Sequence, residues 1–215
     1  MAAPEITVID YGLGNLLSVA RGFEKCGARI TVTADPETIL KSSRLVLPGV
    51  GAFPNARKLL EKKNLIEVIK DFGSSGKPLL AICLGMQLLM DESEEFTNTA
   101  GLGLIPGRVV SIPNYTLAGE TMKIPHIGWS SIFPTQPSAS WMGTVLEKNE
   151  SGDSLYFVHS FMAVPTNPKN VIAYCDFGGH RIAAVVARDN IFGCQFHPEK
   201  SGENGLKIMQ KFCDV

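Results

Sequence analysis

Several features that mark common protein classes are missing from this 215-residue chain. Its 20 basic and 21 acidic residues nearly cancel and form no basic block, which argues against a nucleic-acid footprint and against a polybasic membrane patch. No apolar stretch is long enough to cross a bilayer, and residues 1–5 lack the charged start of a signal peptide. We therefore expect a cytoplasmic protein whose partners include no nucleic acid and no membrane.

The cysteines also lack the pattern of a cross-linked or zinc-binding fold. They are odd in number, widely spaced and contain no C-x-x-C pair, so neither a disulfide framework nor a zinc knuckle is expected. A reducing compartment fits this pattern best. The cysteines stand at positions 26, 83, 175, 194 and 213.

The first half of the chain alternates apolar runs with helical patterns. The runs predict strands at 6–10, 29–33 and 45–47 and a fourth that ends at Cys83. Helical spacing or a cap signal between them predicts helices that begin near Leu16, Pro36 and Leu65, and another that follows Cys83. Such alternation is typical of a parallel sheet covered on both faces.

The second half reads mainly as strands, because short apolar runs are separated there by Gly, Pro and Asn. Gly178-Gly179 and Asp189-Asn190 predict hairpin turns, segment 113–152 is expected to be rich in loops, and a helix is expected from Gly205 to Phe212. We predict one α/β domain over residues 1–215, whose open, mostly parallel sheet is flanked by helices and extended by an antiparallel strand region. The later strands are expected at 107–112, 154–158, 171–176, 182–188 and 191–196.

Cys83 stands where an apolar run ends and a helix-forming run begins at once. A strand that feeds directly into a helix makes a sharp turn, which holds the side chain of its middle residue above the sheet edge, as in the nucleophile elbow. The amide of the next residue, Leu84, can then face a developing oxyanion. Gly85 supports this interpretation, since a residue without Cβ lets the turn pass close to its neighbours. A merely buried, apolar cysteine is the alternative.

A Gly-x-Gly sequence follows the third predicted strand. Gly49, Val50 and Gly51 stand just past its carboxyl end, where open α/β sheets bind ligands and where free backbone amides can hold an oxyanion. A plain turn leaving the strand is the alternative for this segment taken alone.

His197-Pro198-Glu199 follows the last predicted strand. In extended backbone, residues two apart point the same way and lie roughly 6–7 Å apart, so that Glu199 can orient the imidazole of His197. Carboxyl ends of parallel strands converge at one sheet edge, which would bring this pair to Cys83 as nucleophile, general base and orienting carboxylate.

Three motifs stand in the order of a known family: Pro-Gly-Val-Gly at 48–51, Cys-Leu-Gly-Met-Gln at 83–87 and His-Pro-Glu at 197–199. With them, the chain resembles the class I (triad) glutamine amidotransferases, of flavodoxin-like fold, over nearly its whole length. It is most similar to the glutaminase subunits of imidazole glycerol phosphate synthases. That narrower similarity is carried by segments 10–16, 125–129, 156–160 and 197–201.

The resemblance implies hydrolysis of glutamine to glutamate and ammonia. It assigns nucleophilic attack to Cys83, proton transfer to His197 and orientation of the base to Glu199, and it implies neither a metal nor a cofactor. By the same similarity, the substrate glutamine would contact Gln87, Glu95, and the backbone at Ser160 and Phe161.

The resemblance also implies a heterodimer. The ammonia would enter a cyclase subunit of (β/α)₈-barrel fold, which makes imidazole glycerol phosphate and an aminoimidazole carboxamide ribotide. Trp129 and Lys200 stand in interface positions of that family.

Two positions depart from the narrower family pattern. Ser130 stands where asparagine is usual, and Phe161 stands where tyrosine is common. A paralogue that supplies a different synthase therefore stays open, as do a free-standing cysteine hydrolase and an inactive regulatory module. The intact Cys83, His197 and Glu199 argue against the inactive module, and Trp129 with Lys200 argues against the free-standing enzyme.

Overall fold

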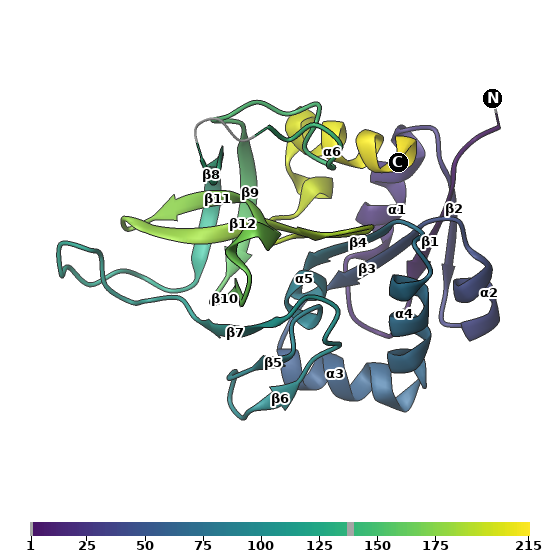
Figure 1. Ribbon diagram of the computed structural model, residues 1–215, viewed down its shortest axis with the longest axis horizontal. Helices are drawn as coiled ribbons and strands as arrows, with labels where there is room; N and C mark the ends of the chain where they lie inside the picture. The colour runs from purple at the N-terminus through teal and green to yellow at the C-terminus, as the bar shows by residue number, and fades with distance from the viewer. Residues whose placement is uncertain (1, 137–139) are drawn as a thin grey trace.

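A nine-stranded sheet forms the centre of the molecule, of which the structure, a computed structural model, describes residues 2–136 and 140–215 (Figure 1). Its strands are β1 (Glu5–Ile9), β2 (Arg29–Thr33), β3 (Leu45–Gly49), β4 (Leu79–Cys83), β8 (His126–Pro134), β9 (Ser154–His159), β11 (Val171–Phe177), β12 (His180–Arg188) and β13 (Ile191–Cys194). Their order across the sheet is β2-β1-β3-β4-β13-β12-β11-β8-β9. Neighbours from β2 to β13 pair in parallel, and the remaining pairs are antiparallel. This confirms the predicted fold class.

A smaller, four-stranded sheet lies below the antiparallel half in the view of Figure 1. It has the order β10-β7-β5-β6, and its longest contact pairs β7 with β10 in antiparallel register. Its strands are β5 (Glu92–Ser93), β6 (Thr99–Ala100), β7 (Gly107–Ser111) and β10 (Phe161–Pro165).

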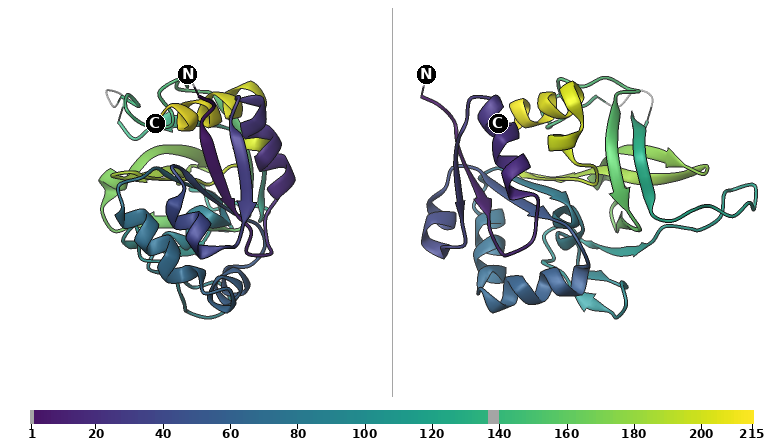
Figure 2. Two further views of the ribbon diagram at one scale, coloured as in Figure 1. Left: turned by 90° about the vertical axis from the view of Figure 1, so that its right-hand side faces the viewer. Right: turned by 180° about the vertical axis from the view of Figure 1, so that it is seen from behind.

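Helices cover both faces of the parallel half. On one face lie α1 (Leu16–Lys25) and the C-terminal α6 (Gly202–Asp214), which contact each other (Figures 1 and 2). The other face is covered by α2 (Pro36–Lys41), α3 (Phe53–Lys62), α4 (Leu65–Ser74) and the short α5 (Leu84–Leu88). Two 3₁₀ turns complete the structure, η1 (Pro168–Asn170) and η2 (Pro198–Lys200).

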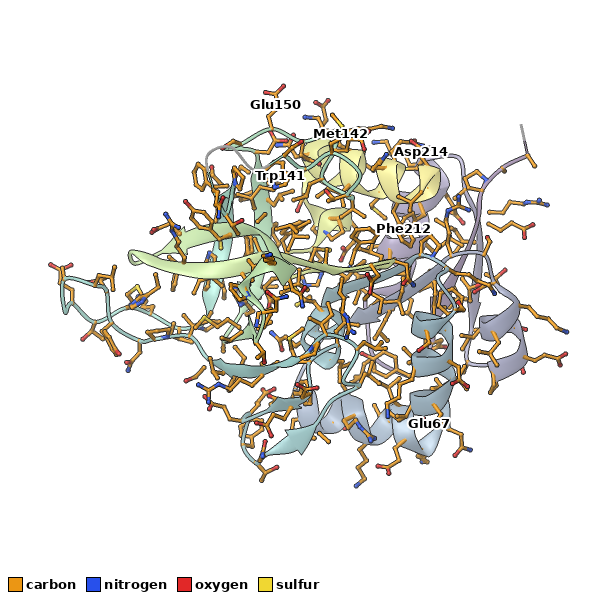
Figure 3. The ribbon with its side chains drawn as sticks, viewed as in Figure 1. Glu67, Trp141, Met142, Glu150, Phe212 and Asp214 are labelled. Carbon is orange, nitrogen blue, oxygen red and sulfur yellow. The ribbon has the colours of Figure 1, made fainter. Side chains whose placement is uncertain are left out.

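Alternation along the buried strands divides the core into two clusters. In β3, Val46 packs with the cluster of α1 and α6, whereas Leu45 and Leu47 pack with the cluster of α3, α4 and α5. Successive side chains of a strand point to opposite faces, so a strand covered on both faces must be apolar throughout. Phe212 shows how α6 contributes, because its ring points from the helix toward the sheet and is fully buried (Figure 3).

The structure corrects several details of the sequence interpretation. Segment 113–152 is not only loops, because β8 runs through it for nine residues; residues 137–139 of that segment lie outside the described residues. Several elements, among them α3 and β10, have no counterpart among the predicted ones. The predicted helix after Cys83 is short and ends at Leu88. Within the described ranges, the structure contains no helix with the length and apolar character needed to span a bilayer.

Candidate active site

Cys83 ends β4 and is followed by α5 with no intervening loop. Its backbone has φ 55° and ψ −112°, a left-handed conformation that is strained for a residue with a Cβ. The expected sharp turn is therefore present. Because such strain persists only when the surroundings enforce it, the turn marks Cys83 as a residue with a special role.

Close packing beneath this turn depends on two glycines. A Cβ added to Gly85 would lie 2.0 Å from the carbonyl oxygen of Leu47, and one added to Gly49 would lie 2.8 Å from the amide nitrogen of Gly85. The start of α5 thus lies directly against the end of β3. The Gly-x-Gly segment and the cysteine turn are held together by backbone contact, with no side chain between them.

The strand that delivers His197 lies next to the strand that delivers Cys83. Parallel pairing of β13 with β4 places Cys194 beside Ile82, so both chains leave the sheet at the same edge. There the amide of His197 donates to the carbonyl of Tyr156 at 2.9 Å, and the hydroxyl of Ser201 donates to the carbonyl of His197 at 2.6 Å. The histidine backbone is therefore fixed from two sides.

Glu199 reaches His197 by a route that the sequence interpretation described wrongly. Residues 198–200 form the 3₁₀ turn η2, whereas an extended backbone was expected. Proline fixes φ near the helical value and so favours such a turn at its first position. The result is a direct hydrogen bond of 2.8 Å between Nδ1 of His197 and Oε1 of Glu199.

The imidazole of His197 is held in its charged form. Burial lowers the pKa of His197, but the interactions with Cys83 and with the Glu199 carboxylate outweigh burial and raise the pKa to about 9. The Glu199 side chain is itself fully buried, and its Oε2 has no hydrogen-bond partner among the described residues. With Nδ1 bound to the carboxylate, Nε2 of His197 remains available for proton transfer at the pocket.

A cavity of about 280 Å³ lies where these elements meet. Cys83 and His197 both line it, whereas Gly49 lies beneath the turn and Glu199 lies behind His197. The other predicted site residues on its wall are Val50, Gly51, Leu84, Gln87, Glu95, Ser160 and Phe161. Residues far apart in the sequence thus form one pocket lined by a thiol, an imidazole, a carboxylate and residues of the Gly-x-Gly segment.

Known protein families and structures resemble this chain along nearly its whole length. Residues 7–215 match the family described as Glutamine amidotransferase class-I. The chain belongs to this family. Among solved structures, this amidotransferase superimposes on "Structure of PurLQS from Thermotoga maritima" with a TM-score of 0.73 at 20% identity, covering 99% of both chains. At that identity the likeness concerns the fold alone.

Relatives of higher sequence identity belong to one kind of synthase subunit. The amidotransferase is 50% identical over 210 residues to "Imidazole glycerol phosphate synthase subunit HisH 1" of Legionella pneumophila (strain Lens), covering 98% of this chain and 99% of that protein. It is 46% identical over 211 residues to "Imidazole glycerol phosphate synthase subunit HisH" of Syntrophotalea carbinolica, covering 98% of this chain and 100% of that protein.

Gln87 lies in the wall of the amidotransferase pocket, where its amide is fully engaged. Its Nε2 donates to the carbonyl of Phe161 and to Oε1 of Gln195, each at 3.0 Å. Gln195 in turn donates to the sulfur of Cys83 at 3.8 Å. Sequence reasoning missed Gln195, although a glutamine in an apolar strand needs a buried partner and in that sense signals a site.

Glu95 brings a carboxylate to the opposite wall. It is nearly buried, and its Oε2 accepts a hydrogen bond of 2.7 Å from the amide of Phe53 at the start of α3. One oxygen is therefore used to hold the amidotransferase backbone in place. The negative charge of the group still faces the cavity.

Tyr11 is a further buried polar residue that the sequence interpretation did not select. Its hydroxyl has no hydrogen-bond partner among the described residues, and it would lie 2.7 Å from a Cβ added to Gly49. Burial raises the pKa of Tyr11, and the nearby Cys83 raises it further. The phenol therefore stays neutral and packs under the amidotransferase's Gly-x-Gly segment.

Trp129 and Lys200, the two predicted interface residues, both lie at the surface. The indole of Trp129 is 57% exposed. It stands on β8 opposite Tyr156 of β9, and the two rings meet edge to face at 6.0 Å. Since Tyr156 also accepts from the amide of His197, the exposed indole lies a short distance from the amidotransferase triad.

A larger groove of about 780 Å³ lies elsewhere, along β10, β11 and β12. Its described lining is mainly aliphatic, and at one point Arg181 stacks over the ring of Tyr174 at 4.4 Å. Those lining residues include no cysteine, histidine or carboxylate. The smaller cavity is therefore the one equipped for the amidotransferase reaction.

Proposed function

We propose that this chain is the glutaminase subunit of an imidazole glycerol phosphate synthase and that residues 1–215 form a single amidotransferase domain. The observation that supports this best is the meeting of Cys83, His197 and Glu199 at one cavity. The chain that carries it is 50% identical to a HisH subunit over 98% of its length.

In the reaction that we propose, the sulfur of Cys83 attacks the side-chain amide carbon of glutamine. The carbonyl oxygen becomes an oxyanion, which amides in segment 49–51 and at Leu84 stabilise. The protonated His197 donates its proton to the departing nitrogen, so the C–N bond breaks, ammonia leaves and a thioester forms. His197 then removes a proton from water, whose attack on the thioester releases glutamate and regenerates the thiolate beside the protonated His197.

Glu199 has a supporting part in this cycle. Its bond to Nδ1 keeps the proton-transferring Nε2 pointed at the pocket, and its charge stabilises the imidazolium. Substrate selection would rest on the other walls. The carboxylate of Glu95 suits the α-ammonium of a free amino acid, while Gln87 and the backbone at Ser160 and Phe161 bound the side-chain end.

We further propose that the ammonia passes to a (β/α)₈-barrel cyclase subunit in a heterodimer. Trp129 would anchor the docking surface, and Lys200, next to the triad, would lie near the transfer path. The cyclase would use the ammonia to convert a phosphorylated ribulosyl-aminoimidazole intermediate into imidazole glycerol phosphate and an aminoimidazole carboxamide ribotide.

Glutamate release tests this function directly. The chain is assayed alone, with the cyclase subunit, and with the cyclase subunit plus its nucleotide ligand, and the mixtures are run on a sizing column. We expect slow hydrolysis by the isolated chain, a 1:1 complex, and faster release when the ligand is present, because the ligand favours the complex with a formed oxyanion site. Equal rates in all mixtures, with no complex formed, would instead support a free-standing hydrolase.

A further inference from the structure

Two buried histidines next to the triad are not used by the mechanism above. His126 at the start of β8 and His159 at the end of β9 are 2% and 6% exposed. They stand opposite each other in the β8–β9 pair, and Nδ1 of His126 lies 3.1 Å from Nε2 of His159. Two further bonds extend the pair, from Nε2 of His126 to the hydroxyl of Ser130 at 2.9 Å and from Nδ1 of His159 to the carbonyl of Phe161 at 2.8 Å.

These contacts determine where each proton lies if both rings are neutral. A carbonyl oxygen only accepts, so Nδ1 of His159 carries a proton and its Nε2 does not. Nδ1 of His126 must then donate to that Nε2, which leaves Nε2 of His126 as an acceptor. A donor at position 130 completes the row, and the hydroxyl of Ser130 supplies it.

The surroundings keep both rings neutral. Burial lowers the pKa of His126, and it lowers the pKa of His159 to about 4, with the charges of His126 and His197 adding to the effect. Phe157 and Phe177 stack on His126 with centroid distances of 5.1 and 4.2 Å and offer no counter-charge. Protonation of His159 on Nε2 would also point that N–H at the Nδ1–H of His126.

The hydrogen-bonded row from Ser130 through His126 and His159 continues into the glutamine pocket. The Phe161 carbonyl that accepts from His159 also accepts from Gln87, which is linked through Gln195 to the sulfur of Cys83. At its other end, Ser130 is the neighbour of the exposed Trp129. A continuous series of hydrogen bonds thus joins strand β8 to the nucleophile.

We propose that His126 and His159 are positioning residues, a neutral pair in fixed tautomers that holds the Phe161 carbonyl, and hence the Ser160–Phe161 wall of the glutamine pocket, in register with β8. The inference rests on the proposed glutaminase function for its substrate, but the tautomers themselves do not. Ser130 donates the hydrogen bond that begins this row, which gives a reason for a serine at this position.

The first test determines which ring nitrogen of each histidine carries a proton. Full-length protein labelled with ¹⁵N at its histidines is examined by NMR near neutral pH, where protonated and unprotonated ring nitrogens have well-separated frequencies. We expect both rings to carry their proton on Nδ1 alone, and Ser130→Ala to shift the His126 signals while Ser131→Ala, on the same strand, leaves them unchanged. An Nε2 proton on either ring of the parent, or equal effects of the two serine variants, would overturn the assignment.

The second test measures the affinity for glutamine by calorimetry. It uses the full-length Cys83→Ser chain in complex with the cyclase subunit, so that glutamine is not hydrolysed. His159→Leu in that background removes the donor to Phe161 and should weaken binding about tenfold, as expected for the loss of one hydrogen bond of ~1.4 kcal/mol. His159→Asn can still donate there and should recover most of the affinity, and His180→Gln, remote from the pocket, should leave the affinity unchanged. Equal affinities for the Leu and Asn variants, at similar unfolding midpoints, would refute positioning. If no chain binds glutamine at all, the proposed function fails, whereas the NMR result still decides the tautomers.

Discussion

The charged state of His197 makes a quantitative prediction about stability. The interactions with Cys83 and Glu199 outweigh burial and raise its pKa from 6.5 to about 9. At about 1.4 kcal/mol for each pKa unit, this difference corresponds to about 3 kcal/mol of folding free energy. Because the folded-state pKa is the higher one, the contribution is complete below pH 6.5 and is lost as the pH rises through about 9.

The assay is urea unfolding of the parent and of His197→Gln under reducing conditions, across the pH window between those two pKa values. The free energy of unfolding of the parent should fall by about 3 kcal/mol more than that of the variant over this window. Glu199→Gln and Cys83→Ser should each remove part of the extra slope, while His180→Gln, away from the triad, should keep it. Parallel pH curves for the parent and His197→Gln would refute the reasoning.

Three further predictions concern the turn, the nucleophile and the surface. Gly85→Ala should destabilise the fold by ~2 kcal/mol in urea unfolding, since its Cβ would meet the rigid carbonyl of Leu47, whereas Gly22→Ala, which meets only a flexible methionine, should cost less; equal costs would contradict this. Cys83→Ser should abolish glutamine hydrolysis but leave the fold and complex formation intact, and a glutamine-analogue electrophile should label only Cys83 in the parent; an active Cys83→Ser protein would exclude the assignment. Trp129→Ala should weaken cyclase binding by ~2 kcal/mol in a titration, while Met142→Ala, at a more exposed apolar residue, should not, and similar losses for both would mean that β8 is not the anchor.

Local patterns were sufficient to predict the parallel half of the fold. The inner strands β3, β4 and β13 are covered on both faces, so they appear in the sequence as mainly apolar runs, and the run before Cys83 ends where its strand ends. The hairpin turns at Gly178-Gly179 and Asp189-Asn190 were also predicted, because these turn residues favour the tight backbone that the pairing requires.

Features that depend on tertiary contacts could not be predicted in this way. Strand β8 has a weak pattern because it exposes Ile127 and Trp129 and buries a histidine, which reverses the usual signal. The pairing of His126 with His159 depends on the register of two strands separated by a long connection. At the triad, the spacing of His197 and Glu199 indicated the right partners, but the 3₁₀ turn that joins them follows from Pro198.

The position of β13 in the sheet affects the order in which the protein can fold during synthesis. This strand is the last to be made, yet it lies in the middle, between β4 and β12. Until it inserts, β4 presents an open edge, and no strand pairing joins the parallel half of this sheet to the antiparallel half. A nascent chain therefore exposes its cysteine turn long before the histidine arrives, and the reactive pair forms only when the last quarter of the polypeptide closes the sheet.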